Sequence, residues 1–236
     1  MKYQTKCFKV SDANICPYCK NHKIIKNGSS KSKKQQYLCK SCGKRFLDYY
    51  TYNACHKKIN SEIIHFTKEG LGIRSTARVL QISATTLLKR IISIADKISR
   101  PFISKGKIYE VDELRTYIKN KTKLIWIVYA LERGSKKIVS FNIGSRTNKT
   151  LKVVLDTLHL SQAKRIYTDG LKNYRFLISK KMHQVTRFGT NSIERMNLNL
   201  RIHLKRLNRK TVCFSRSVMI LNAVLKIYFW SHSNSF

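Results

Sequence analysis

The spacing of hydrophobic and polar positions divides the chain into three stretches that predict different kinds of structure. From residue 104 onward, apolar residues alternate with polar ones over several short runs, a spacing typical of β-strands. Between residues 57 and 100 they recur every third or fourth position, as on amphipathic helices. The first 50 residues hold only short apolar runs. We therefore expect three domains, at residues 1–50, 51–103 and 104–236.

The third stretch predicts an α/β domain, because three strand-like runs are followed by alternating helices and strands. The expected strands are 108–118, 124–131, 137–143, 165–168 and 183–186. The expected helices are 147–160, 174–179, 191–208 and 214–230. This order is typical of a mixed five-stranded sheet with helices packed on it.

The second stretch predicts a helix-turn-helix. Helices are expected at 59–69, 72–80 and 84–98, and Gly70 ends the first of them. Ala77 is small enough for close packing, and Ile82 fills the turn between the second and third helices. The third helix would offer four polar residues to the major groove of DNA: Thr85, Thr86, Lys89 and Arg90. An ordinary helical linker is the alternative interpretation.

Four cysteines in the first stretch form two CxxC pairs. Cys16 and Cys19 make the first pair, and Cys39 and Cys42 follow after nineteen residues. Two residues between thiolates let one turn present both sulfur atoms to one ion, and four thiolates suit tetrahedral Zn²⁺. Gly43 allows a tight backbone turn behind the second pair. The spacing therefore predicts a Zn²⁺ site in a small zinc ribbon.

The charge of the chain narrows the choice of partners. The 236 residues include 48 Lys and Arg but only 12 Asp and Glu, which gives a net charge of +36. Self-repulsion of this size is tolerable beside a polyanion, so double-stranded DNA is the expected partner. The sequence shows neither a long uncharged apolar run nor an apolar signal core, so we expect no membrane association and a cytoplasmic, nucleoid-associated protein.

The scarcity of acids makes three of them candidates for metal binding. Asp112 lies on the first expected strand of the third domain, Asp169 at the end of the fourth, and Glu194 on the 191–208 helix. If those two strands are neighbours, the aspartates meet and a helix packed on the sheet can bring Glu194 to the same point. Three carboxylates repel one another unless a cation lies between them, and oxygen ligands favour Mg²⁺ or Mn²⁺.

Two assignments stay open from the residues alone. Glu194 could instead complete a capping box with Asn191 at the start of its helix. A shift of one residue in strand register would turn Glu113 inward in place of Asp112. On the same helix as Glu194, two and three turns further, Arg201 and Lys205 are expected to hold a phosphate backbone.

Several motifs resemble those of the DDE transposases of bacterial insertion sequences, in particular the insertion-sequence-one (InsA/InsB) family. They are CPYC…CKSCGKRF near the N-terminus, then VDEL, YTDG and the long run IERMNLNLRIHLKRLNRKTVCFSRSV. The resemblance implies a ribonuclease-H-like catalytic domain whose triad is Asp112, Asp169 and Glu194, with Arg201 near the scissile strand. The chain departs from the family's usual aromatic residues at Leu114-Arg115 and at Leu171.

The expected function is therefore that of a DNA transposase. It would bind terminal inverted repeats, cleave the element ends and join them to target DNA by two-metal-ion phosphoryl transfer. A homo-oligomer on DNA is expected, because two DNA ends must be brought together. The main alternative is a non-catalytic zinc-ribbon and helix-turn-helix regulator derived from a transposase. A weaker one is a structure-selective nuclease, which would share the metal site without joining ends.

Overall fold

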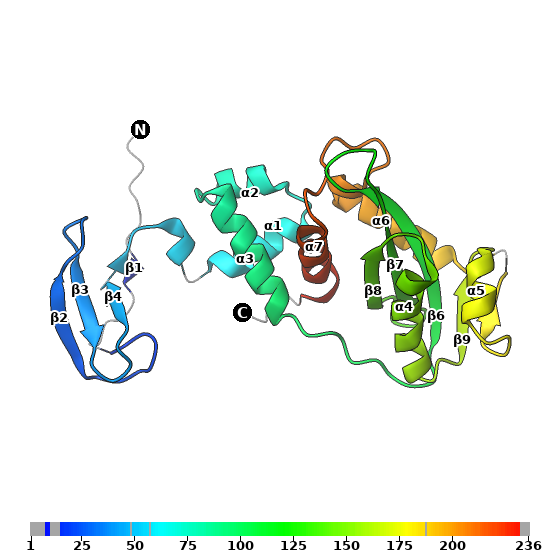
Figure 1. The fold of residues 1–236 in the computed structure, drawn as a ribbon, viewed down its shortest axis with the longest axis horizontal. Helices are drawn as coiled ribbons and strands as arrows, with labels where there is room; N and C mark the ends of the chain where they lie inside the picture. Colours follow the sequence, from blue (N-terminus) through cyan, green and yellow to red (C-terminus); the bar gives the residue numbers. More distant parts are fainter. Residues whose placement is uncertain (1–7, 10–14, 48, 57, 187, 232–236) are drawn as a thin grey trace. The chain divides into compact units, whose positions relative to one another are not determined.

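The computed structural model of the chain describes residues 8–9, 15–47, 49–56, 58–186 and 188–231 (Figure 1). The chain divides into two compact units, one of residues 1–59 with 77–86 and one of residues 60–76 with 87–236. The domain boundaries expected from the sequence stay predictions. Over the described part of the chain, no helix combines the length and apolar character needed to cross a membrane.

A three-stranded antiparallel sheet forms the N-terminal ribbon. Its strands are β2 (Ile24–Ser29), β3 (Gln35–Cys39) and β4 (Arg45–Leu47), in that order. The buried core of this sheet is small and consists of Cys16, Cys39 and Phe46. Strands β1 (Phe8–Lys9) and β5 (Tyr49–Tyr50) form a separate two-stranded sheet. Because so few apolar side chains are buried in the ribbon, we expect metal binding to supply part of its folding energy.

The helices predicted between residues 59 and 98 are confirmed. They are α1 (Ile59–Lys68), α2 (Ile73–Val79) and α3 (Ala84–Lys97), and a short 3-10 helix, η1 (Asn53–Cys55), precedes them. Gly70 follows α1 with a φ of 73°, a backbone conformation that glycine adopts without strain. The Ser83 hydroxyl accepts a hydrogen bond from the Thr86 amide at 3.0 Å, which caps the start of α3.

The C-terminal half contains the predicted mixed five-stranded sheet, in the order β10-β9-β6-β7-β8 (Figure 1). Three antiparallel neighbours come first in the chain: β6 (Ile108–Tyr117), β7 (Leu124–Glu132) and β8 (Ile138–Gly144). Strand β9 (Arg165–Thr168) then pairs parallel to β6, and β10 (His183–Gln184) parallel to β9. This is the ribonuclease-H-like arrangement that the resemblance to DDE transposases implied, with β6 in the centre.

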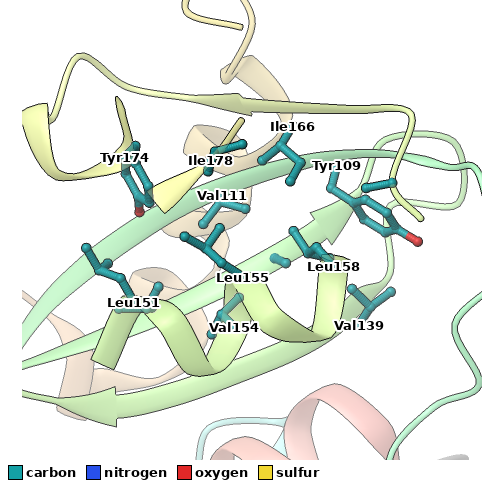
Figure 2. Close-up of a cluster of buried hydrophobic side chains, with 13 residues drawn as sticks. Tyr109, Val111, Val139, Leu151, Val154, Leu155, Leu158, Ile166, Tyr174 and Ile178 are labelled. Carbon is teal, nitrogen blue, oxygen red and sulfur yellow. The ribbon is translucent and has the colours of Figure 1, made fainter. Parts of the chain in front are cut away.

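One face of this sheet carries the main apolar core. Helices α4 (Asn148–Leu160) and α5 (Lys172–Leu177) pack there. Figure 2 shows their side chains meeting Val111 and Tyr109 of β6. Leu155 of α4 lies within this cluster and is 1% exposed.

The opposite face is covered by α6 (Asn191–His203) and α7 (Val218–Trp230). Phe141 of β8 packs against Phe229 and Trp230 of α7, with ring centroids 5.4 and 5.0 Å apart. The hydroxyl of Tyr129, on β7, reaches α6. This second face therefore combines apolar packing with polar contacts to the helix that carries Glu194.

Two helix boundaries differ from the prediction by four residues or more. The helix expected at 191–208 ends at His203, and Lys205–Leu207 form a 3-10 turn, η2. The chain turns there toward β6, whose Thr116 hydroxyl donates to the carbonyl of Arg206 at 3.3 Å. The last helix begins at Val218, because the Ser217 hydroxyl caps it by accepting a hydrogen bond from the amide of Ile220 at 3.2 Å.

Replacing Leu155 with alanine should destabilise the fold by about 2–5 kcal/mol, because the change leaves a cavity between α4 and the sheet. Leu160→Ala on the same helix is the matched control, since that side chain is 82% exposed. Its effect should stay within about 0.5 kcal/mol. Urea denaturation followed by circular dichroism measures both, and equal losses would contradict this description of the core.

Candidate active site and metal centres

Two of the predicted catalytic carboxylates meet where β6 and β9 run side by side. Val111 pairs with Thr168 in this parallel ladder, so the next residues, Asp112 and Asp169, are neighbours. Oxygen atoms of Asp112, Asp169 and Glu113 all lie within 4.8 Å of one another. Clustered carboxylate oxygens are the donors that hard divalent ions such as Mg²⁺ prefer, so the residues present fit such an ion.

The carboxylate of Asp112 is half-buried and held in one orientation. Its Oδ1 accepts a hydrogen bond from the Glu113 amide at 2.7 Å, and its Oδ2 accepts one from Asn197 Nδ2 at 2.6 Å. Burial raises the pKa of Asp112 to about 6, and the carboxylates of Asp169 and Glu113 add to this effect. A cation beside these groups would favour the charged form again.

Glu113 belongs to the opposite face of β6. Its carboxylate accepts hydrogen bonds from Arg146 Nη2 at 2.9 Å and from the hydroxyl of Tyr174, a residue of α5. The guanidinium of Arg146 in turn lies over the ring of Trp126, 4.5 Å from its centroid. Because Glu113 is already neutralised by a cation, Asp112 is the better candidate ligand in the observed register.

Glu194 lies in the first turn of α6 and is exposed. Over the described residues, it is outside the group of carboxylates whose oxygens lie within 4.8 Å of one another. Its Oε1 accepts a hydrogen bond from the Thr190 hydroxyl at 2.8 Å. The alternative interpretation, a capping box with Asn191, is wrong, because Thr190 is the residue that precedes the helix and Asn191 is already helical.

Asn197 is a site residue whose role the sequence did not reveal. Its Nδ2 donates to Asp112, and its Oδ1 accepts a hydrogen bond from the Tyr129 hydroxyl at 2.8 Å. It lies four residues after the buried Ile193, on the side of α6 that faces the sheet. That spacing was the available signal, but a polar residue at such a position gives no partner from sequence alone.

The two basic residues expected beside the carboxylates have different environments. Arg201 lies one turn beyond Asn197, and its pKa is lowered by burial and by the nearby Arg209, although the carboxylate of Asp112 opposes this. Among the described atoms, its Nε is buried without a hydrogen-bond partner. Lys205 is exposed on η2, so the expected alignment of Lys205 with Glu194 along one helix is wrong.

The four paired cysteines converge, and their sulfur atoms all lie within 4.8 Å of one another. Cys16 and Cys42 are 3.6 Å apart at their Sγ atoms, and Cys19 and Cys39 are 3.5 Å apart. Four sulfurs around a tetrahedral Zn²⁺, at Zn–S distances of about 2.3 Å, would be about 3.8 Å apart. The donor set and its spacing therefore fit zinc.

The two cysteine pairs adopt the same backbone turn. The amide of Lys20 donates to the carbonyl of Cys16, and the amide of Gly43 to that of Cys39, both at 2.9 Å. Lys20 and Gly43 both have positive φ, at 60° and 68°. Burial alone would raise the pKa of Cys39, but backbone hydrogen bonds from Cys42 and Ser41 lower it to about 6. Despite burial, the pKa of Cys16 is also lowered by backbone hydrogen bonds, so the turn favours the thiolate form at the first cysteine of each pair.

The residues proposed to contact DNA on α3 differ in their accessibility. Thr85 and Lys89 are exposed, and Arg90 is half-buried. The hydroxyl of Thr86 lies 2.8 Å from that of Ser83 and accepts a hydrogen bond from the Tyr52 hydroxyl at 3.1 Å. Thr86 therefore helps to hold the start of α3, and DNA contact by the four residues stays a prediction.

Removal of one zinc ligand should abolish metal binding. Purified Cys39→Ser protein is expected to lose the single bound zinc ion, and its ribbon should lose ordered structure, because three thiolates do not close a structural site. Cys55→Ser is the control, since Cys55 is an exposed free thiol. Elemental analysis of zinc per chain measures the outcome, and full zinc content in Cys39→Ser would refute the assignment.

The raised pKa of Asp112 predicts a pH-dependent stability in the absence of divalent ions. Its pKa of about 6 in the folded chain exceeds the ordinary value of 3.8, so ionisation of this group destabilises the fold. The free energy of unfolding should therefore fall as pH rises from about 4 through 6. Asp112→Asn should therefore melt higher than the native chain above pH 6, by an equivalent of about 2–3 kcal/mol. Below pH 4 the two curves should converge.

The control for this measurement is Asp156→Asn, which changes an exposed carboxylate on α4. Its melting curve should follow that of the native chain at every pH. Mg²⁺ should raise the melting temperature of the native chain and leave that of Asp112→Asn nearly unchanged. A constant offset between Asp112→Asn and the native chain across pH 4–8 would contradict the assigned environment.

Comparison with known proteins places these features in a family. The family profile described as IS1 transposase matches residues 107–234. The insertion element IS1 protein InsB of Shigella flexneri is 37% identical over 119 residues, covering 50% of this chain and 91% of that protein. The iso-IS1n protein InsB of Shigella dysenteriae is 33% identical over 125 residues, covering 53% and 95% respectively.

Among solved structures, the catalytic core domain of HTLV-2 integrase in complex with magnesium is similar at 14% identity and a TM-score of 0.32. That match covers 54% of this chain and 86% of the integrase chain, and it is too distant to support an argument. The family assignment depends instead on the profile, which covers the whole five-stranded sheet and both helices over its second face. The chain belongs to the IS1 transposase family.

Proposed function

We propose that this chain is a DNA transposase that cleaves the ends of an insertion sequence and joins them to target DNA by metal-assisted phosphoryl transfer. The observation that supports this most directly is the meeting of Asp112 and Asp169 on neighbouring parallel strands. Asp112 lies at the face of the sheet on which the basic helix α6 packs. Oxygen ligands and positive charge are thus combined where a phosphodiester would lie.

Asp112, Asp169 and Glu194 are the proposed ligands of Mg²⁺ or Mn²⁺. When bound, two such ions would activate the attacking oxygen and stabilise the leaving oxygen of an in-line displacement. Glu194 now accepts the hydroxyl of Thr190. The proposed role of Glu194 therefore requires its side chain to change rotamer. The carboxylate would then lose the hydrogen bond from Thr190 and bind the ion instead.

Three other side chains prepare the proposed site. Asn197 donates a hydrogen bond to Asp112 Oδ2 and accepts one from the Tyr129 hydroxyl, so it fixes the orientation of the Asp112 carboxylate. Arg201 has a buried Nε without a partner among the described atoms, and its guanidinium would neutralise a phosphate beside the carboxylates. The guanidinium would also hold the DNA strand in line for attack.

The N-terminal ribbon and the helix-turn-helix are proposed to bind the DNA ends. The net charge of +36 supplies the sequence-independent attraction to phosphates. Exposed Thr85 and Lys89 at the start of α3 are the candidates for groove contacts. Assembly of two or more copies on paired ends stays part of this proposal.

The test is cleavage of duplex DNA that carries the terminal repeats flanking the gene, in the presence of Mg²⁺. Asp169→Asn should lower the rate of strand cleavage and joining by at least about 100-fold, because it removes a charged group that holds the reacting centre. DNA affinity should stay within about twofold, since most of that affinity comes from basic residues elsewhere. Asp156→Asn is expected to cleave at the native rate.

Three results would contradict the proposal. Native activity in Asp169→Asn would remove the carboxylates from the mechanism. Tight, repeat-specific DNA binding without cleavage under any divalent ion would favour a DNA-binding regulator instead. Cleavage without joining of the freed ends would point to a nuclease.

A further inference from the structure

Glu110 is a buried acid that the proposed chemistry does not use. It lies two residues before Asp112 on β6 and therefore on the same face of the sheet. Its side chain is fully buried, and Oε1 lies 3.3 Å from Nε of Arg133. An ionised side chain in such a place costs stability unless its contacts compensate, so its partners need an explanation.

The second oxygen of Glu110 binds the start of α6. Oε2 accepts a hydrogen bond from the amide of Ile193 at 2.9 Å. The first amides of a helix have no partner within the helix, and a carboxylate there also interacts favourably with the helix dipole. Ile193 directly precedes Glu194, so Glu110 holds the backbone of the neighbouring residue.

A second contact fastens the next turn of the same helix. The Tyr129 hydroxyl donates toward the carbonyl of Ile193 at 3.2 Å and to Asn197 at 2.8 Å, and Asn197 bonds Asp112. Residues 193 and 197 are one turn apart on the side of α6 that faces the sheet. Glu194 lies between these two fixed points, so its backbone has a set position relative to Asp112.

We propose that Glu110 is a positioning residue that sets the location of Glu194 beside the paired aspartates. This inference rests on the proposed function, in which Glu194 completes the metal site. Glu110 acts through the amide of Ile193 and touches neither ion nor DNA. Its loss would let the first turn of α6 shift, and the metal would then be held by two carboxylates.

The experiment measures binding of Mn²⁺ alone to the full chain by electron paramagnetic resonance. Glu110→Leu keeps the volume and removes the acceptor, so it should weaken Mn²⁺ binding about tenfold, as expected when a residue that orients a metal ligand is lost. Glu194→Ala should weaken it similarly. The Glu110→Leu and Glu194→Ala double variant should be no weaker than either single variant, because both changes remove the same ligand.

Two matched variants separate positioning from general destabilisation. Glu110→Gln keeps an oxygen that can accept the amide of Ile193, so Mn²⁺ affinity should stay within about threefold of the native value. Ile91→Ala changes a buried side chain on α3, outside the five-stranded sheet that carries the carboxylates. It should lower the melting temperature and leave Mn²⁺ affinity unchanged.

Native Mn²⁺ affinity in Glu110→Leu would overturn the inference, as would equal losses in Glu110→Gln and Glu110→Leu. Additive losses in the double variant would also overturn it. If Mn²⁺ binding follows the expected double-mutant cycle of Glu110→Leu and Glu194→Ala but the native chain never cleaves DNA, the proposed function is wrong and the positioning role of Glu110 stands. A native chain that binds no Mn²⁺ would overturn both.

Discussion

The parallel pairing of β6 with β9 is the constraint on which the site depends. Its register sets Val111 against Thr168, so the aspartates that follow each residue must be neighbours. Parallel strands cannot be joined by a tight turn, and the chain between β8 and β9 includes the helix α4 that packs on the same sheet. The apolar core around α4 therefore also holds the two carboxylates together, although it contains neither of them.

The acids that are buried in this basic chain lie close to one another and have arginine partners. Glu110 pairs with Arg133 and Glu113 with Arg146, one on each face of β6. Each arginine also lies over an aromatic ring, of Tyr167 and Trp126 respectively, at 4.5 Å from the centroid. Asp112 lies between them in sequence, and over the described residues it forms no ion pair with an arginine, so the proposed divalent ion would balance its charge.

The position of α6 depends on polar contacts as well as on its apolar stripe. Ile193 and Leu200 are fully buried, which fixes the face of the helix that meets the sheet. Hydrogen bonds from Ile193 and Asn197 to the acids of β6 then set its rotation and height. Directional contacts resist sliding more than apolar packing does, so the helix carrying Glu194 is well suited to a site that needs fixed geometry.

The sequence by itself determined the elements and the ligand types. Alternating apolar positions predicted the strands and the two CxxC pairs predicted the sulfur site, because these signals depend on local geometry. The scarcity of acids, together with the resemblance to DDE transposases, selected Asp112 and Asp169. Only the tertiary structure decided the partners of Asn197 and Glu110, the end of α6 at His203 and the placement of Glu194 outside the carboxylate group. The contacts of Asn197 and Glu110 join residues that are 85 and 83 positions apart in the sequence. Strand register and helix packing bring such residues together, and neither produces a periodic pattern in the sequence that would predict the pair.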